Sequence, residues 1–70
     1  MKTKILTPRE KEIFDYLIRN YSTKKIAKTL GISEKTVRNH ISNVMQKLEV
    51  TSRTSAVIEL LKLNLFEIND

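Results

Sequence analysis

Apolar residues recur at intervals of three and four along most of the chain, which is the period of an amphipathic α-helix. The first stripe follows residues 7–10, Thr-Pro-Arg-Glu, which have the form of a capping box with proline at the first helical position. Cap and stripe together predict a helix over residues 8–20. Its apolar side is formed by Ile13, Phe14, Leu17 and Ile18.

Three further stripes predict three more helices, over residues 23–30, 34–48 and 53–63. A hydroxyl residue suited to cap a helix precedes each of them: Ser22 or Thr23, Ser33 and Ser52. Gly31 follows the shortest stripe and suits the left-handed position that ends a helix. The sequence shows no strand-like alternation, no internal repeat and no linker. We therefore expect one all-α domain of four helices over residues 1–70.

Residues 26–37 match the helix-turn-helix pattern position by position. Ala27 is small enough for two helices to approach, and Gly31 permits the positive backbone dihedral of the turn. Ile32 and Val37 are placed to fix the crossing angle of the second helix of the motif. In this motif that helix enters the major groove of DNA.

Charge is concentrated in the same region, because residues 22–48 hold six basic residues against one acid, Glu34. A basic face is the expected footprint of a nucleic-acid binder, although a solvated lysine-rich surface has the same composition. Arginine can bind guanine and asparagine can bind adenine through paired hydrogen bonds. The residues left outside the apolar stripe of the third helix are Lys35, Thr36, Arg38, Asn39, Ser42, Asn43 and Gln46.

Several linked blocks resemble the LuxR-type (GerE-like) DNA-binding domain, over residues 6–63 in all. The blocks are residues 6–10 (Leu-Thr-Pro-Arg-Glu), 22–27 (Ser-Thr-Lys-Lys-Ile-Ala), 32–41 (Ile-Ser-Glu-Lys-Thr-Val-Arg-Asn-His-Ile), 47–50 (Lys-Leu-Glu-Val) and 53–57 (Arg-Thr-Ser-Ala-Val). The sequence departs from the family at Glu49, where a glycine is usual, and at residues 20–21, where a small residue and a glycine are usual.

The resemblance implies a four-helix domain whose third helix reads the groove and whose fourth pairs with a second copy. Candidate base-reading residues are Arg38, Asn39 and Ser42, to which the outward face of the third helix adds Asn43. Lys35 is grouped with them, although its position suits either a base or a phosphate contact. Candidate phosphate contacts are Thr23, Lys24, Thr36, His40 and Lys47, together with Ser33 at the helix N-terminus, where free amide groups favour an anion. The implied dimer surface comprises Thr54, Val57, Ile58, Leu61 and Leu65.

Two further residues, His40 and Arg53, each have two possible roles. His40 lies between the apolar stripe and the outward face, so it suits either a structural role or a phosphate contact. Arg53 suits either a DNA contact or an internal salt bridge, for example with Glu10 or Glu12, and it stays outside the predicted site.

The composition excludes several classes of site. The chain has no cysteine and one histidine, so neither a disulfide framework nor a metal site is expected. It has no nucleophile–base pair, carboxylate dyad or glycine-rich phosphate loop, so we expect no catalytic residues, no cofactor and no small-molecule substrate. No segment is long and apolar enough to cross a bilayer. We expect a cytoplasmic, nucleoid-associated protein.

These features predict a sequence-specific transcriptional regulator that binds double-stranded DNA as a homodimer. The length and the starting methionine resemble the stand-alone GerE-like members, which regulate sporulation genes. Three alternatives remain at this point. The chain can be an effector domain excised from a two-component response regulator, a module like region four of sigma factors that contacts RNA polymerase, or a helical bundle that binds only protein.

Overall fold

Four helices make up the fold in the computed structural model, which describes residues 6–63. They are α1 (Pro8–Ile18), α2 (Thr23–Leu30), α3 (Glu34–Leu48) and α4 (Arg53–Lys62). No strand occurs in the described part of the chain. The predicted all-α, four-helix class is therefore confirmed. The first helix ends at Ile18, earlier than the expected position 20, because the chain turns at Arg19 and Asn20.

Each helix begins at a hydroxyl side chain that accepts a hydrogen bond from a backbone N–H of the first turn. At α1 the capping box is complete: the Thr7 hydroxyl accepts from the Glu10 N–H at 3.1 Å, and the Glu10 carboxylate accepts from the Thr7 N–H at 3.0 Å. The caps of the other helices are Ser22, Ser33 and Ser52, which accept from Lys25, Thr36 and Ser55.

Left-handed residues lie in all three connections between the helices. Gly31 ends α2 with φ 71°, as expected for a glycine at this position. Asn20 (φ 69°) and Glu49 (φ 58°) adopt the same region without being glycines. Asparagine tolerates it comparatively well, whereas glutamate is strained there. The chain thus keeps a left-handed turn after α3 although it lacks a glycine at that position.

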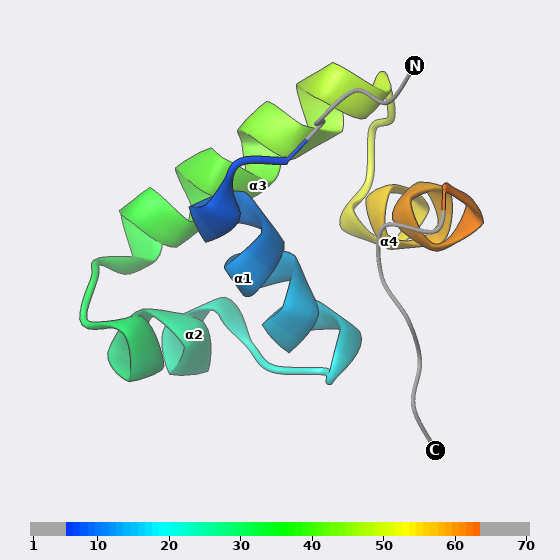
Figure 1. Ribbon diagram of the computed structural model, residues 1–70. Coiled ribbons are helices and arrows are strands. Elements are labelled where there is room, and N and C mark those ends of the chain that lie inside the picture. The colour runs from blue at the N-terminus through cyan, green and yellow to red at the C-terminus, as the bar shows by residue number, and fades with distance from the viewer. Residues whose placement is uncertain (1–5, 64–70) are drawn as a thin grey trace.

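The core lies between α3 and the other helices, and Figure 1 shows α3 crossing the molecule with α2 near its N-terminal end and α4 near its C-terminal end. Every helix contributes buried apolar side chains. They are Ile13 and Phe14 from α1, Ile26 and Ala27 from α2, Val37, Ile41 and Val44 from α3, and Ala56 and Leu60 from α4. Because α3 buries only one side, its opposite side is left to solvent.

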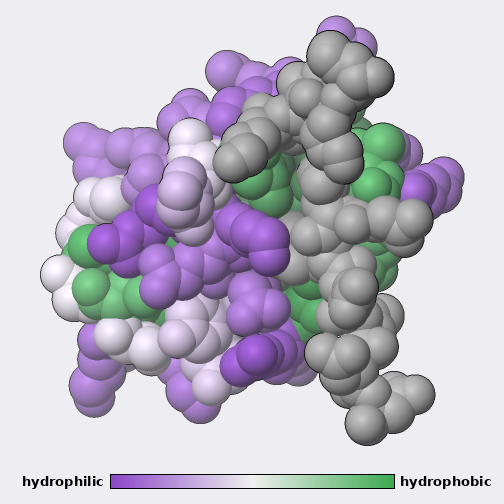
Figure 2. Space-filling model, in the orientation of Figure 1, coloured by the Kyte–Doolittle hydropathy of each residue, from purple (hydrophilic) through white to green (hydrophobic). Residues whose placement is uncertain are grey.

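Hydrophilic residues predominate over α1 and α2 on the face shown in Figure 2, and hydrophobic surface appears beside α4. Two large apolar side chains of this region, Ile58 and Leu63, are each 47% exposed. Part of the aliphatic surface that the core leaves uncovered thus lies near α4, and Figure 2 shows a second hydrophobic patch at the left, on the side of α2.

An aromatic cluster joins α1 to α2. The rings of Tyr16 and Tyr21 lie with centroids 4.9 Å apart, and the Lys25 ammonium lies 4.4 Å from the centroid of Tyr21. Tyr21 is thus held between a ring and a cation, which is a favourable geometry for both contacts. The cluster thus packs Tyr21, in the connection, against one residue of each of the two helices.

Candidate nucleic-acid interface

The candidate base-reading residues occupy the exposed side of α3, opposite Val37, Ile41 and Val44 of the core. This set, here called the reading face, consists of Lys35, Arg38, Asn39, Ser42 and Asn43, all of which are exposed. Their spacing follows the helical period, so the structure brings all of them to one side of one rigid element. Gln46 extends the same side toward the C-terminal end of α3.

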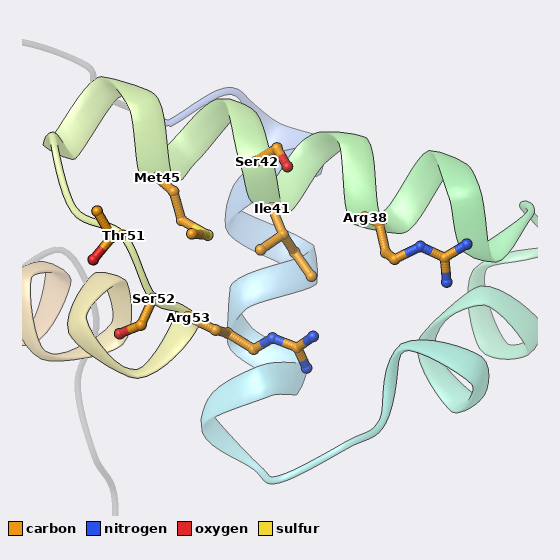
Figure 3. Close-up of a pocket in the computed structure, with 7 residues that line it drawn as sticks. All are labelled: Arg38, Ile41, Ser42, Met45, Thr51, Ser52 and Arg53. Carbon is orange, nitrogen blue, oxygen red and sulfur yellow. The ribbon is translucent and has the colours of Figure 1, made fainter.

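A shallow groove of about 240 Å³ borders the reading face where α3 meets the start of α4. Its floor is apolar, and its rim carries hydroxyls and arginines. In Figure 3, Arg53 extends from the start of α4 toward the side on which Arg38 projects from α3. No carboxylate lines this groove, whose lining residues are Arg38, Ile41, Ser42, Met45, Thr51, Ser52 and Arg53.

The N-terminal part of α2 presents a second group of polar side chains. Thr23 is half-buried at the first position of α2, and Lys24 beside it is exposed. Lys28 is exposed one turn further along. None of the salt bridges found among residues 6–63 involves Lys24 or Lys28, so both cations face solvent.

Ser33 and Thr36 are already engaged with each other at the start of α3. The Ser33 hydroxyl accepts from the Thr36 N–H at 3.0 Å and lies 2.9 Å from the Thr36 hydroxyl. Ser33 is exposed and Thr36 is half-buried. Both hydroxyls thus hold the first turn of α3 in place, and one hydroxyl proton of the pair can still point outward.

A third row runs along the edge of α3 that faces the start of α1. It contains Thr36, His40 and Lys47, of which Thr36 and His40 are half-buried. The Nζ atom of Lys47 donates a hydrogen bond of 2.6 Å to Oε1 of Glu10. Lys47 is therefore anchored on α1, with 38% of its side chain still exposed.

Glu10 is the buried charged residue at this contact, with only 4% of its surface exposed. Burial acts to raise its pKa, but the hydrogen bonds from Lys47 and Thr7 and the positive charges of Lys47 and His40 outweigh burial. The pKa of Glu10 therefore lies below the ordinary value. The carboxylate stays ionised and links the α1 cap to the far end of α3.

The internal salt bridge considered for Arg53 does not form with either expected partner. Glu10 pairs with Lys47, and Glu12 pairs with Arg9 at 3.4 Å on α1. Arg53 is exposed and makes no ion pair within residues 6–63. The sequence could not show this, because the partners of Glu10 and Glu12 are set by the packing of α1 against α3. Arg53 thus joins the groove beside Arg38.

The predicted dimer residues lie along α4. Thr54 and Ile58 are exposed, whereas Val57 and Leu61 are half-buried and pack partly against the core. Leu65 lies outside the described residues. Four of the expected positions therefore share a helix whose apolar surface is incompletely covered.

The family described as bacterial regulatory proteins of the luxR family matches residues 4–60 of the chain. This match includes the capping box of α1, the helix-turn-helix and most of α4. The chain belongs to the LuxR family.

This LuxR-family chain is similar to known proteins both in sequence and in structure. It is 56% identical over 64 residues to the spore germination protein GerE of Bacillus subtilis (strain 168). The matched residues are 91% of this chain and 86% of GerE. A solved structure of the transcription factor GerE superposes with a TM-score of 0.90 at 55% identity, covering 96% of this chain and 100% of that one. The transcriptional regulatory protein DegU of Brevibacillus brevis is 50% identical over 58 residues, which are 83% of this chain and 25% of DegU.

Membership of the LuxR family establishes the broad function. The chain is a DNA-binding transcriptional regulator of the GerE/LuxR type with a helix-turn-helix, and DNA is its partner. The matched family is described as one of bacterial regulatory proteins and not as a family of enzymes. Within residues 6–63, no helix is long and apolar enough to span a membrane, and no group of histidine and acidic side chains is arranged to hold a metal ion.

Proposed function

We propose that this LuxR-family regulator binds a two-fold symmetric DNA site as a homodimer and inserts α3 of each protomer into a major groove. The single observation that carries the proposal is the reading face, whose five polar side chains share the exposed side of one helix braced by the core. Among these side chains are one arginine and two asparagines, which are the residue types that pair with guanine and adenine. A helix held rigidly at its back presents such groups in a fixed register.

Base reading is assigned to the reading face, and phosphate binding to residues that flank it. Thr23 and Lys24 contact the backbone on the α2 side of the groove, and Ser33 and Thr36 contact it at the start of α3. His40 and Lys47 contact it along the edge near α1, where the pairing of Lys47 with Glu10 leaves the ammonium partly exposed. Such contacts set the affinity and the salt dependence but not the sequence preference.

Arg53 is added to the phosphate contacts on structural grounds. It lines the groove with Arg38 and Ser42, and its guanidinium extends toward the reading face (Figure 3). An exposed arginine beside a helix that lies in a major groove is within reach of the backbone at the groove edge. Phosphate contacts would then lie on both sides of α3, with Thr23 and Lys24 of α2 on one side and Arg53 at the start of α4 on the other.

Dimerisation is assigned to α4, through Thr54, Val57, Ile58, Leu61 and Leu65. The 47% exposure of Ile58 beside two half-buried apolar neighbours supports this assignment. A two-fold axis through α4 would place the two reading helices on successive turns of the duplex. The similarity to a protein named for spore germination supports a role in sporulation, on the bacterial nucleoid.

A second candidate function is suggested by the coverage of the relatives. The chain spans a quarter of DegU, so the same domain also occurs as part of a longer regulator. Under this alternative, the chain is the DNA-binding effector domain of a response regulator. Its own residues would bind DNA in the same way, but pairing of the domains would depend on the remainder of such a protein.

The deciding experiment is selection from a randomised duplex library, followed by sedimentation of the chain with the selected duplex. Enrichment of an inverted repeat bound by two chains is the expected result. Enrichment of a single half-site bound by one chain would favour the effector-domain alternative. Salt-sensitive binding without any enrichment would contradict sequence-specific recognition, and pull-down with purified RNA polymerase would then test the polymerase-contacting alternative.

A further inference from the structure

A single carboxylate lies beside the reading face. Glu34 is the only acidic residue between positions 22 and 48, where six residues are basic. It is the first residue of α3, directly after the Ser33 cap. Its Oε1 accepts a hydrogen bond from Nη1 of Arg38 at 3.4 Å, one helical turn along. The one acid of the basic segment is therefore paired with the arginine assigned to base reading.

This pair contributes little to the stability of the fold. The side chains of Arg38 and Glu34 are 57% and 43% exposed, and exposed ion pairs four residues apart on a helix contribute little to stability. The first turn of α3 is already held by the Ser33 cap, and the helix is anchored by Val37 in the core. The effect of Glu34 therefore has to be sought in how Arg38 meets DNA.

The contact leaves Arg38 able to bind a base. A guanidinium carries five N–H donors, and the bond to Glu34 uses one of them, so enough remain for a paired contact with guanine. The same contact opposes the other use of the arginine, because a swing of Arg38 away from Glu34 to a phosphate would break it. A carboxylate next to Arg38 also repels the phosphates themselves. Both effects favour the base edge over the backbone.

We propose that Glu34 is a positioning residue that raises the sequence selectivity of DNA binding by holding Arg38 for a base edge and away from the phosphates. This inference rests on the proposed function, because it requires Arg38 to read a base. This role is distinct from a role in stability. Removing the Glu34 carboxylate should lower the sequence selectivity and steepen the salt dependence of DNA binding while the fold stays intact.

The test compares the selected duplex with a shuffled duplex of the same length and composition. Glu34→Gln should raise the affinity for the shuffled duplex more than the affinity for the selected duplex. The ratio of the selected to the shuffled affinity should therefore fall about two- to fivefold. The salt slope on the shuffled duplex should steepen by up to about 0.9, because the released Arg38 adds one phosphate contact. An equal gain on both duplexes, or an unchanged ratio, would overturn the inference.

Glu12→Gln is the matched control. It removes the same charge from a pair of the same length, 3.4 Å to Arg9, but on α1. It should leave the affinity ratio at the wild-type value, and a fall as large as that of Glu34→Gln would assign the effect to net charge and overturn the inference.

The Arg38→Ala background separates this inference from the proposed function. Glu34→Gln should not change the ratio in that background, because Glu34 acts through Arg38. A further fall there would mean that Glu34 contacts DNA by itself, and the inference would be wrong. If Arg38→Ala alone leaves the ratio unchanged, base reading by Arg38 fails as well. If Arg38→Ala lowers the ratio and Glu34→Gln does not, only the role of Glu34 is lost.

Discussion

The Nζ atom of Lys47 lies 2.6 Å from Oε1 of Glu10, although the two residues are 37 positions apart in the sequence. Glu10 belongs to the capping box that starts α1, and Lys47 to the last turn of α3. The contact therefore ties the cap of one helix to the end of the helix that carries the reading face. Its loss should affect both the stability of the fold and the placement of α3.

Replacement of Glu10 tests the contribution of this contact to stability. Glu10→Gln removes the charge that compensates Lys47 in a largely buried position. We expect the free energy of unfolding to fall by about 1 to 3 kcal/mol, less than for a fully buried pair because Lys47 is more than a third exposed. Urea denaturation at neutral pH measures the change. Glu12→Gln, at an exposed pair, should change it by less than about 0.5 kcal/mol.

The same carboxylate predicts a dependence of stability on pH. The pKa of Glu10 is lower in the folded chain than its ordinary value of 4.5, so the stabilisation is fully present above that value and is lost as the pH falls below it. The difference in unfolding free energy between the wild type and Glu10→Gln should therefore shrink as the pH is lowered from above 4.5 to below it. Urea titrations across that range measure it, and a difference that stays constant would contradict the lowered pKa.

Arg38→Ala tests base reading. Loss of a paired contact with guanine should cost about 1 to 3 kcal/mol on the selected duplex and relax the preference at one base position. Fluorescence anisotropy with the selected duplex and its single-base variants measures both effects. Equal weakening on selected and shuffled DNA would instead make Arg38 a phosphate contact. The exposed Arg19 on the far end of α1 supplies the control, as Arg19→Ala should leave the preference intact.

Lys24→Ala tests the phosphate contacts on the α2 side of the groove. Because a phosphate contact carries no sequence information, binding should weaken alike on all duplexes, and the slope of affinity against salt should fall by about 0.9. Titrations at several salt concentrations measure the slope. Lys62→Ala, at an exposed lysine near the end of α4, should leave the slope unchanged. An unaltered slope for Lys24→Ala would remove this residue from the DNA contacts.

Ile58→Asp tests the dimer surface. A charge at a side chain that is 47% exposed should be tolerated by the monomer but not by an apolar interface, so we expect dimer dissociation to increase by about tenfold or more. Sedimentation with and without the selected duplex measures it. Leu63 is exposed to the same extent but lies outside the predicted surface, so Leu63→Asp should leave assembly unchanged. Equal dissociation by both variants would point to a general effect of charge near α4.

Local signals account for what the sequence predicted well. Thr7, Ser33 and Ser52 cap the helices expected of them, and Gly31 takes the left-handed position, because each acts through bonds within one turn. The exposed side of α3 followed from the apolar period, so the members of the reading face could be named in advance. The roles assigned to these residues toward DNA remain predictions.

Contacts between distant segments were not predictable in the same way. The partner of Glu10 depends on how α1 crosses α3, and neither Lys47 nor the solvent-facing position of Arg53 follows from residue spacing. The end of α1 at Ile18 was also missed, because Asn20 takes a positive φ that an asparagine permits but does not require. Glu49 takes the same region despite the cost, as the left-handed residue that ends α3.

The aromatic cluster between α1 and α2 gives the chain a built-in optical reporter. There is no tryptophan, and the chain has two tyrosines, Tyr16 on α1 and Tyr21 in the connection to α2, whose rings lie against each other. Any intrinsic tyrosine emission therefore originates at this one connection, where Lys25 lies over the Tyr21 ring. The connection leads into the start of α2, where Thr23 and Lys24 are assigned to the DNA backbone. A change in tyrosine fluorescence would therefore report the binding of the domain to DNA without an added label.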